Sequence, residues 1–102
     1  MPKPKAEAMP SKSLRLASVR RRINRLDERL LRLLNERARL ALAIGRIKRR
    51  KKWPVYDARR EAFVLSHVRQ GNRGPLSNHA VAKIFQAILS QCRRRERDGK
   101  RK

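Results

Sequence analysis

The sequence of 102 residues predicts an all-α fold with three helices per chain, on three observations. Apolar residues recur every three or four positions over long stretches, which is the period of an α-helix. No segment shows the apolar and polar alternation that is typical of a strand. Proline and glycine gather between the periodic stretches, where they favour turns. A chain of this length forms about one domain.

The first helix is expected over residues 14–52, which contain no proline and a single glycine. Trp53-Pro54 ends it, because the residue before a proline disfavours the α conformation. Its apolar stripe is formed by Leu16, Val19, Ile23, Leu26, Leu30, Leu33, Ala41 and Ile44.

The length of this first helix predicts an intertwined helical homodimer. A helix of about 35 residues is roughly 50 Å long, whereas a compact domain of about 100 residues has a radius of gyration of about 13 Å. The apolar stripe would therefore continue beyond the domain of its own chain. A second chain, related by a two-fold axis and pairing its long helix with this one, would keep the stripe out of water.

Two shorter helices follow. The second is expected from Asp57 and the third from Ser77, because both side chains can accept hydrogen bonds from the free amides of a first helical turn. Residues 70–75, QGNRGP, form the turn between them. Their apolar faces are formed by Phe63, Val64 and Val68 in the second helix and by Val81, Ile84, Phe85, Ile88, Leu89 and Cys92 in the third.

The two ends of the chain differ in composition from its middle. Residues 1–13 contain three of the five prolines, and residues 93–102 contain no apolar residue. We therefore expect a flexible basic tail over residues 1–13, one folded domain over residues 14–96 and a basic C-terminal tail over residues 97–102.

The chain is strongly basic, with 30 Lys and Arg against 8 Asp and Glu and a net charge of +22. This charge attracts anions, so nucleic acid, anionic membrane surfaces and small anionic metabolites are the partners to weigh. A single cysteine excludes an internal disulfide, and two histidines twelve residues apart predict no metal site. No apolar run reaches the roughly 18 residues of a membrane span. We also expect no secretory signal, because no apolar stretch follows Lys3 and Lys5. We expect a cytoplasmic protein without membrane attachment.

Two cations interrupt the apolar stripe of the first helix. Continuing the stripe from Leu33 in steps of three and four reaches Arg37 and Lys48. A cation on a buried face must extend to solvent, pair with an acid such as Asp57 or Glu61, or bind an anion. The Cα atoms of Arg37 and Lys48 are about 16 Å apart along a helix, which leaves room for a compact dicarboxylate but not for a duplex.

The start of the second helix offers further polar groups to such a pocket. Asp57, Arg60 and Glu61 share one helical face, because they are three and four residues apart. They form either a cap with a surface ion pair, or a third cation and two acceptors for a hydroxyl group.

The stretch from residue 19 to residue 61 closely resembles the all-α chorismate mutase family. The resemblance rests on D-E-x-L-L-x-L-L-x-E-R-x-x-L-A from Asp27, G-x-x-K from Gly45 and P-V-x-D-x-x-R-E from Pro54, with GPLS and IFQAILSQC matching the third helix. It covers residues 14–96 and implies an intertwined homodimer. It also implies conversion of chorismate to prephenate in the biosynthesis of phenylalanine and tyrosine, without a cofactor.

The resemblance also implies a role for each site residue. Arg37 and Arg60 would hold the substrate carboxylates, and Lys48 would donate to the ether oxygen of the breaking bond. Arg20 would enter the pocket of the partner chain. The remaining roles are binding of the ring hydroxyl by Glu61 with the neighbourhood of Asp57, contact with a carboxylate by Cys92, and contact with the ether oxygen by Glu96.

Two positions depart from the commonest family pattern. Cys92 stands where a small hydroxyl residue is frequent, and packing in the core is the alternative role for a thiol. Glu96 stands where either Gln or Glu occurs, and a carboxylate cannot donate a hydrogen bond. We therefore expect Glu96 to act in its protonated form, with activity that falls as the pH rises. Gly99 follows closely, so the helix is expected to fray and to leave Glu96 loosely placed.

Two alternatives stay open from the sequence. One is a basic helical dimer that binds nucleic acid nonspecifically, since the runs at residues 20–22, 49–52 and 93–97 could contact phosphates without reading bases. No helix-turn-helix or zinc-finger spacing supports a specific reader. The other is a catalytically silent homologue, against which the retained charged residues argue.

Overall fold

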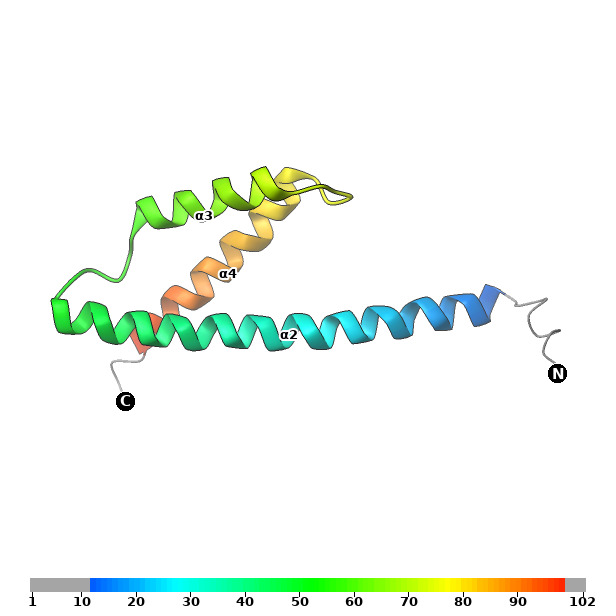
Figure 1. Ribbon diagram of the computed structural model, residues 1–102, viewed down its shortest axis with the longest axis horizontal. Helices are drawn as coiled ribbons and strands as arrows, with labels where there is room; N and C mark the ends of the chain where they lie inside the picture. Colours follow the sequence, from blue (N-terminus) through cyan, green and yellow to red (C-terminus); the bar gives the residue numbers. More distant parts are fainter. Residues whose placement is uncertain (1–11, 99–102) are drawn as a thin grey trace. The chain divides into compact units, whose positions relative to one another are not determined.

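The computed structural model describes residues 12–98, and its regular structure within them consists of three α-helices (Figure 1). The helices are α2 (Lys12–Lys51), α3 (Ala58–Gly71) and α4 (Asn78–Asp98), and the described residues contain no strand. The all-α, three-helix prediction is confirmed. The expected tails fall largely on residues 1–11 and 99–102, which lie outside the described residues, so the division into domain and tails stays a prediction.

The end of α2 is set by a left-handed residue rather than by the proline alone. Lys52 has φ of 59°. Its backbone N–H donates to the carbonyl of Arg49 at 3.2 Å, and the N–H of Trp53 donates to the carbonyl of Lys48 at 2.8 Å. This paired arrangement is the Schellman motif, which satisfies carbonyls that lack partners at a helix end. It turns the chain into the segment of residues 53–57, which leads to α3.

Both predicted capping residues occupy the predicted places. The Asp57 carboxylate accepts a hydrogen bond from the backbone N–H of Arg60 at 3.0 Å, and the Ser77 hydroxyl accepts one from the N–H of Ala80 at 3.0 Å. Between the helices, the Asn72 side chain donates to the carbonyl of Leu76 at 2.8 Å and accepts from the N–H of Gly74 at 3.1 Å. The turn between α3 and α4 is thus closed by its own polar groups.

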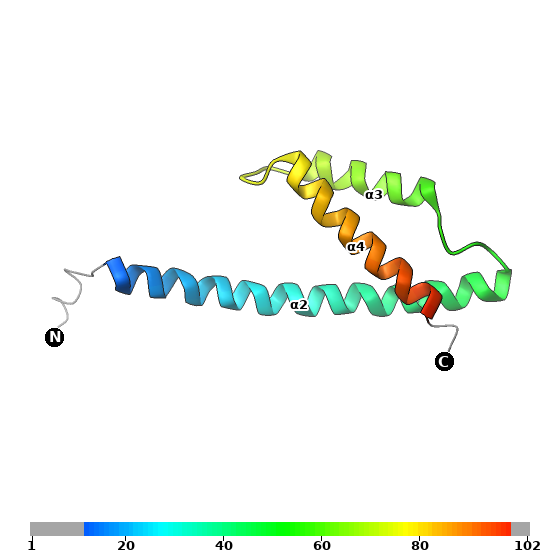
Figure 2. The same cartoon turned by 180° about the vertical axis from the view of Figure 1, so that it is seen from behind.

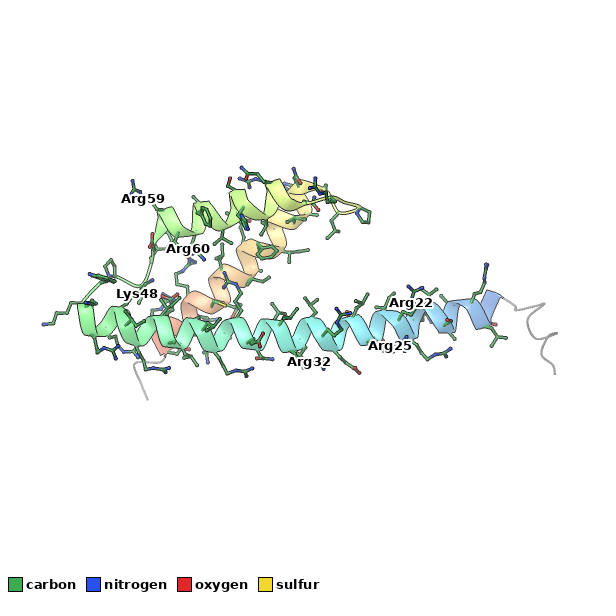
Figure 3. All side chains as sticks on the ribbon, in the orientation of Figure 1. Arg22, Arg25, Arg32, Lys48, Arg59 and Arg60 are labelled. Carbon is green, nitrogen blue, oxygen red and sulfur yellow. The ribbon has the colours of Figure 1, made fainter. Side chains whose placement is uncertain are left out.

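The chain divides into two compact units, with the boundary between residues 33 and 34 of α2. The described part of the first unit is the helical stretch of residues 12–33, from which Arg22, Arg25 and Arg32 project (Figure 3). Its large apolar side chains are all about half exposed or more: Leu14, Leu16, Val19, Ile23, Leu26, Leu30, Leu31 and Leu33. The apolar stripe predicted here is present, and within the single chain it is open to solvent.

The second unit contains the rest of α2 together with α3 and α4. Both views show α4 running from the end of α3 back to the C-terminal half of α2 (Figures 1 and 2). Among the described residues of this unit, the buried side chains come from all three helices, and they are Ala41, Val64, Val81, Ala82, Leu89 and Cys92. The core is small, so polar contacts contribute to holding α4 against α2. None of the helices within residues 12–98 has the length and hydropathy of a bilayer span.

Candidate functional site

The second unit contains a cavity of about 470 Å³, which is within the size range of small-molecule sites. Its walls come from the C-terminal half of α2, the segment before α3, the first turn of α3 and the C-terminal half of α4. The lining residues are Arg37, Leu40, Ala41, Ile44, Lys48, Val55, Asp57, Arg60, Glu61, Leu89, Cys92 and Glu96.

Seven of the eight predicted site residues line this one cavity. They come from separate parts of the sequence and include the two cations that interrupt the apolar stripe, Arg37 and Lys48. The eighth, Arg20, belongs to the first unit and is exposed. Its predicted role in a partner chain's pocket therefore stays a prediction.

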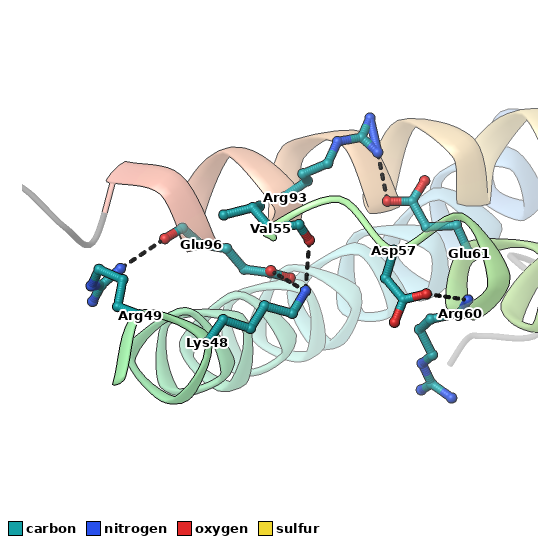
Figure 4. A network of polar contacts seen from close by, with 8 residues as sticks. All are labelled: Lys48, Arg49, Val55, Asp57, Arg60, Glu61, Arg93 and Glu96. Atoms are coloured by element: carbon teal, nitrogen blue, oxygen red, sulfur yellow. Dashed lines mark hydrogen bonds and ion pairs between the residues drawn. The ribbon is translucent and has the colours of Figure 1, made fainter. Parts of the chain in front are cut away.

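Lys48 is held by two acceptors (Figure 4). Its Nζ donates to Glu96 Oε1 at 2.8 Å and to the carbonyl of Val55 at 2.6 Å, and its side chain is only 15% exposed. The ion-pair alternative considered from sequence named Asp57 or Glu61 as the acid, whereas the acid is Glu96, 48 residues away along the chain. Two fixed acceptors hold the ammonium group at the cavity wall, where its charge is little screened by water.

Glu96 is anchored through both its side chain and its backbone. Besides the pair with Lys48, its backbone carbonyl accepts a hydrogen bond from Arg49 Nη1 at 3.1 Å. This carbonyl lies in the last turn of α4, where backbone acceptors lack partners within the helix. The expectation of a loosely placed Glu96 is wrong, because α4 continues to Asp98 and α2 supplies two cations to its end.

Gly45 allows this close approach of α4 to α2. It is buried, and a Cβ atom added to it would lie 2.7 Å from the carbonyl oxygen of Glu96 and 2.9 Å from its Cα. Gly45, Lys48 and Arg49 are three and four residues apart and so lie on one face of α2. We call these three residues the docking face, because all of them meet Glu96.

Arg93 is a residue of the site's surroundings that sequence reasoning missed. Its Nη1 donates to Glu61 Oε2 at 2.5 Å, and both side chains are about three-quarters buried. Its guanidinium also lies over the ring of Tyr56, 5.0 Å from the centroid. Within the sequence, Arg93 begins a run of basic residues that indicates a solvated surface. The sequence contains one indication that Arg93 lies near the site: it is three residues before Glu96 and therefore on the same side of the helix.

Three cations and three acids line the cavity, and they differ in whether they have a partner within the protein. Glu96 pairs with Lys48, and Asp57 caps α3. Arg37 and Arg60 have no carboxylate within ion-pair distance among the described residues; the guanidinium of Arg60 lies 5.3 Å from the ring centroid of Phe63. The cavity therefore presents two guanidinium groups to a ligand. Such an arrangement suits an anion with two carboxylates.

Cys92 contributes a thiol to the cavity wall. Cys92 is 7% exposed and belongs to the core as well as to the cavity wall, which suits the packing role considered from sequence. Within residues 12–98, no group of three or more His, Cys, Asp or Glu side chains is placed to hold a metal ion.

Comparison with known proteins identifies relatives. The family model for chorismate mutase type II matches residues 19–97. The chain is 42% identical over 88 residues to a bifunctional chorismate mutase/prephenate dehydratase of Stutzerimonas stutzeri, covering 80% of this chain and 24% of that protein. The corresponding protein of Pseudomonas aeruginosa is 46% identical over 82 residues, covering 76% of this chain and 22% of that protein. The chain thus spans about a quarter of the length of these bifunctional relatives.

Similarity extends to a shorter relative and to solved structures. A chorismate mutase of Methanocaldococcus jannaschii is 29% identical over 76 residues, covering 74% of this chain and 77% of that protein. A chorismate mutase structure from Thermus thermophilus, form II, superposes with a TM-score of 0.80 and 32% identity, covering 81% of this chain and 94% of that one.

We expect a methyl group at Gly45 to weaken the docking of α4. Gly45→Ala should lower the free energy of unfolding by about 2 kcal/mol, because its Cβ meets backbone atoms of Glu96 that cannot move as a flexible side chain would. Urea denaturation followed by circular dichroism at fixed protein concentration measures this change.

Gly71→Ala is the matched control for the Gly45 variant. A Cβ at Gly71 would have no neighbouring atom within 4 Å. In a helix this exchange should leave stability unchanged or raise it by up to about 1 kcal/mol. Equal effects of the two exchanges would contradict the close approach at Gly45.

Proposed function

Because the chain belongs to the chorismate mutase type II family, we propose that it converts chorismate to prephenate in this cavity, as a step of phenylalanine and tyrosine biosynthesis in the cytoplasm. The observation that carries the proposal is the convergence of Arg37, Lys48, Arg60 and Glu61 on one cavity. Chorismate has two carboxylates, a ring hydroxyl and an ether oxygen, and each of these groups would find a side chain of complementary chemistry among the lining residues. No cofactor is needed for the reaction.

The reaction is an intramolecular rearrangement in which one C–O bond breaks while one C–C bond forms. No nucleophile is activated and no proton transfer is required, so the protein acts by holding the compact conformer and by stabilising developing charge. The guanidinium groups of Arg37 and Arg60, which have no acid partner among the described residues, would bind the two carboxylates. Binding both ends of the substrate restricts it to the folded conformer that reacts.

Lys48 is proposed to provide the main electrostatic contribution to the rate. Partial negative charge develops on the ether oxygen as the C–O bond breaks, and the ammonium group is already fixed at the cavity wall by Val55 and Glu96. A preorganised donor in a partly buried site stabilises such charge more strongly than water does. Glu61, with the neighbourhood of Asp57, would accept a hydrogen bond from the ring hydroxyl.

A homodimer in which Arg20 enters the partner's pocket belongs to the same proposal. The apolar side chains of residues 12–33 are exposed in the single chain, and burying them against a second copy would remove them from water. Arg20 lies on this stretch of helix, so the same pairing could carry it to a second copy's substrate.

The remaining positive charge is proposed to act through its field rather than through contacts. A large excess of cations raises the local concentration of a dianion and its rate of arrival. Nonspecific, salt-sensitive contact with nucleic acid would follow from the same charge. A silent homologue is the competing reading, and the turnover assay below separates it from the enzyme.

Turnover should depend on the Lys48 ammonium group. We expect the purified protein to consume chorismate, followed by the loss of its ultraviolet absorbance, and Lys48→Ala to lower kcat about 10²- to 10³-fold. Arg50→Ala is the matched control, because Arg50 lies two residues further on α2, is exposed and carries the same charge. Absence of turnover in the wild type would contradict the proposed function.

Mixing two inactive variants tests whether Arg20 acts across the dimer. If Arg20→Ala and Lys48→Ala chains are refolded together, random pairing gives one intact pocket in each mixed dimer, so activity should recover to about a quarter of the wild-type value. A mixture of Arg37→Ala and Lys48→Ala chains has no intact pocket and should stay inactive. Equal activity of the two mixtures would contradict a shared site.

The proposed role of Glu96 predicts a pH dependence. In the structure the Glu96 carboxylate pairs with Lys48. To donate to the ether oxygen, Glu96 would instead have to take up a proton, so kcat/KM should fall as the pH rises from mildly acidic to mildly alkaline conditions. Glu96→Gln keeps an N–H donor at every pH and should give a flatter profile. A flat wild-type profile over this range would show that Glu96 need not be protonated.

A further inference from the structure

We propose that Arg93 is a positioning residue that compensates the charge of Glu61 and thereby sets the affinity of the cavity for a dianion. The inference rests on the proposed function and concerns a residue outside the cavity wall. Arg93 is absent from the cavity lining, whereas Glu61 belongs to it. Arg93 therefore acts on a ligand only through the carboxylate that it holds.

The contact between Arg93 and Glu61 joins two helices across the site. Arg93 is in α4 and Glu61 is in the first turn of α3, 32 residues earlier, and their side chains meet at 2.5 Å (Figure 4). Both are mostly buried, with exposed fractions of 24% and 23%. A charge-assisted hydrogen bond that is shielded from water is stronger than an exposed ion pair.

Tyr56 restricts where the guanidinium of Arg93 can go. The Arg93 guanidinium lies 5.0 Å from the centre of the Tyr56 ring, within the range of a cation–π contact. Tyr56 belongs to the segment between α2 and α3. The carbonyl of Val55, the residue before it, accepts a hydrogen bond from Lys48. The arginine is thus fixed between a carboxylate and an aromatic face, which distinguishes it from its exposed neighbour Arg94.

The charge balance of the cavity explains why this pair matters to an anionic ligand. The lining cations Arg37, Lys48 and Arg60 equal in number the lining acids Asp57, Glu61 and Glu96, so the wall alone has no net charge. Glu96 is already paired with Lys48. An unpaired carboxylate at Glu61 would repel a dicarboxylate, whereas the hydrogen-bonded pair with Arg93 neutralises that carboxylate.

The pair also directs the hydrogen bonding of Glu61. Arg93 is bonded to Oε2, which orients the carboxyl plane and leaves Oε1 as the oxygen that can accept from a substrate hydroxyl. A neutral residue at position 93 would therefore remove both charge compensation and orientation. The first effect weakens binding of a dianion, and the second weakens binding of the hydroxyl.

The experiment compares variants at positions 93 and 94 for catalysis and for binding. Arg93→Met should raise KM for chorismate about tenfold and change kcat by less than about threefold, because a nearby unpaired charge opposes binding of the dianion. Arg94→Met removes the same charge from the same helix and should leave KM within about twofold of the wild type. Arg93→Lys restores a cation and should recover most of the affinity.

A second background shows whether Arg93 acts through Glu61. In a Glu61→Gln chain the carboxylate charge is gone, so adding Arg93→Met should change KM by less than about twofold. A tenfold rise in both backgrounds would overturn the proposal, since it would place the effect of Arg93 elsewhere. Thermal unfolding of each variant identifies a loss that comes from misfolding.

A binding measurement separates the proposal from the proposed function. Calorimetric titration with a bicyclic ether dicarboxylate, shaped like the rearranging conformer, gives Kd without turnover. Binding that weakens in Arg93→Met, in a protein that does not consume chorismate, would uphold the role of Arg93 and overturn the enzyme. Turnover in the wild type with unchanged KM and Kd in Arg93→Met would overturn the role of Arg93 alone. A wild type that neither turns over nor binds would overturn both.

Discussion

The contact of Glu96 with the docking face of α2 is the constraint on which the site depends. Gly45 leaves space for the backbone of α4, Arg49 holds a carbonyl at the end of that helix, and Lys48 pairs with the carboxylate. These contacts place the C-terminal half of α4 as one wall of the cavity. The small apolar core alone would leave that wall less firmly placed, so polar contacts here have a structural function as well as a chemical one.

As a result, the charged side chains of the site fall into two groups with different functions. The ion pairs hold the walls together and fix Lys48, while Arg37 and Arg60, which have no acid partner within residues 12–98, stay available to an anion. Most of the net charge of +22 lies elsewhere on the chain. Total charge is thus a poor guide to the site, and the position of a cation relative to the apolar pattern is a better one.

The sequence predicted the helices, both caps and seven of the cavity-lining residues, because these follow from local periodicity and from a specific family pattern. It did not predict that Glu96 pairs with Lys48 or that Arg93 pairs with Glu61, since both pairs join helices far apart in sequence. Arg93 belongs to a run of basic residues, and its residue type does not distinguish it from Arg94 and Arg95 beside it. The left-handed Lys52 was equally hidden, because a lysine gives no sign of that conformation.

The short segment between α2 and α3 has an unusual status for a connection. Surface loops commonly accept insertions, because extra length costs little free energy. Here the carbonyl of Val55 accepts a hydrogen bond from Lys48 of α2, and the ring of Tyr56 makes a cation–π contact with Arg93 of α4. Two adjacent residues of the segment are therefore in contact with two different helices. One added residue would shift these two groups out of register with their partners. The length of this connection is therefore as much a property of the site as the identity of its charged side chains.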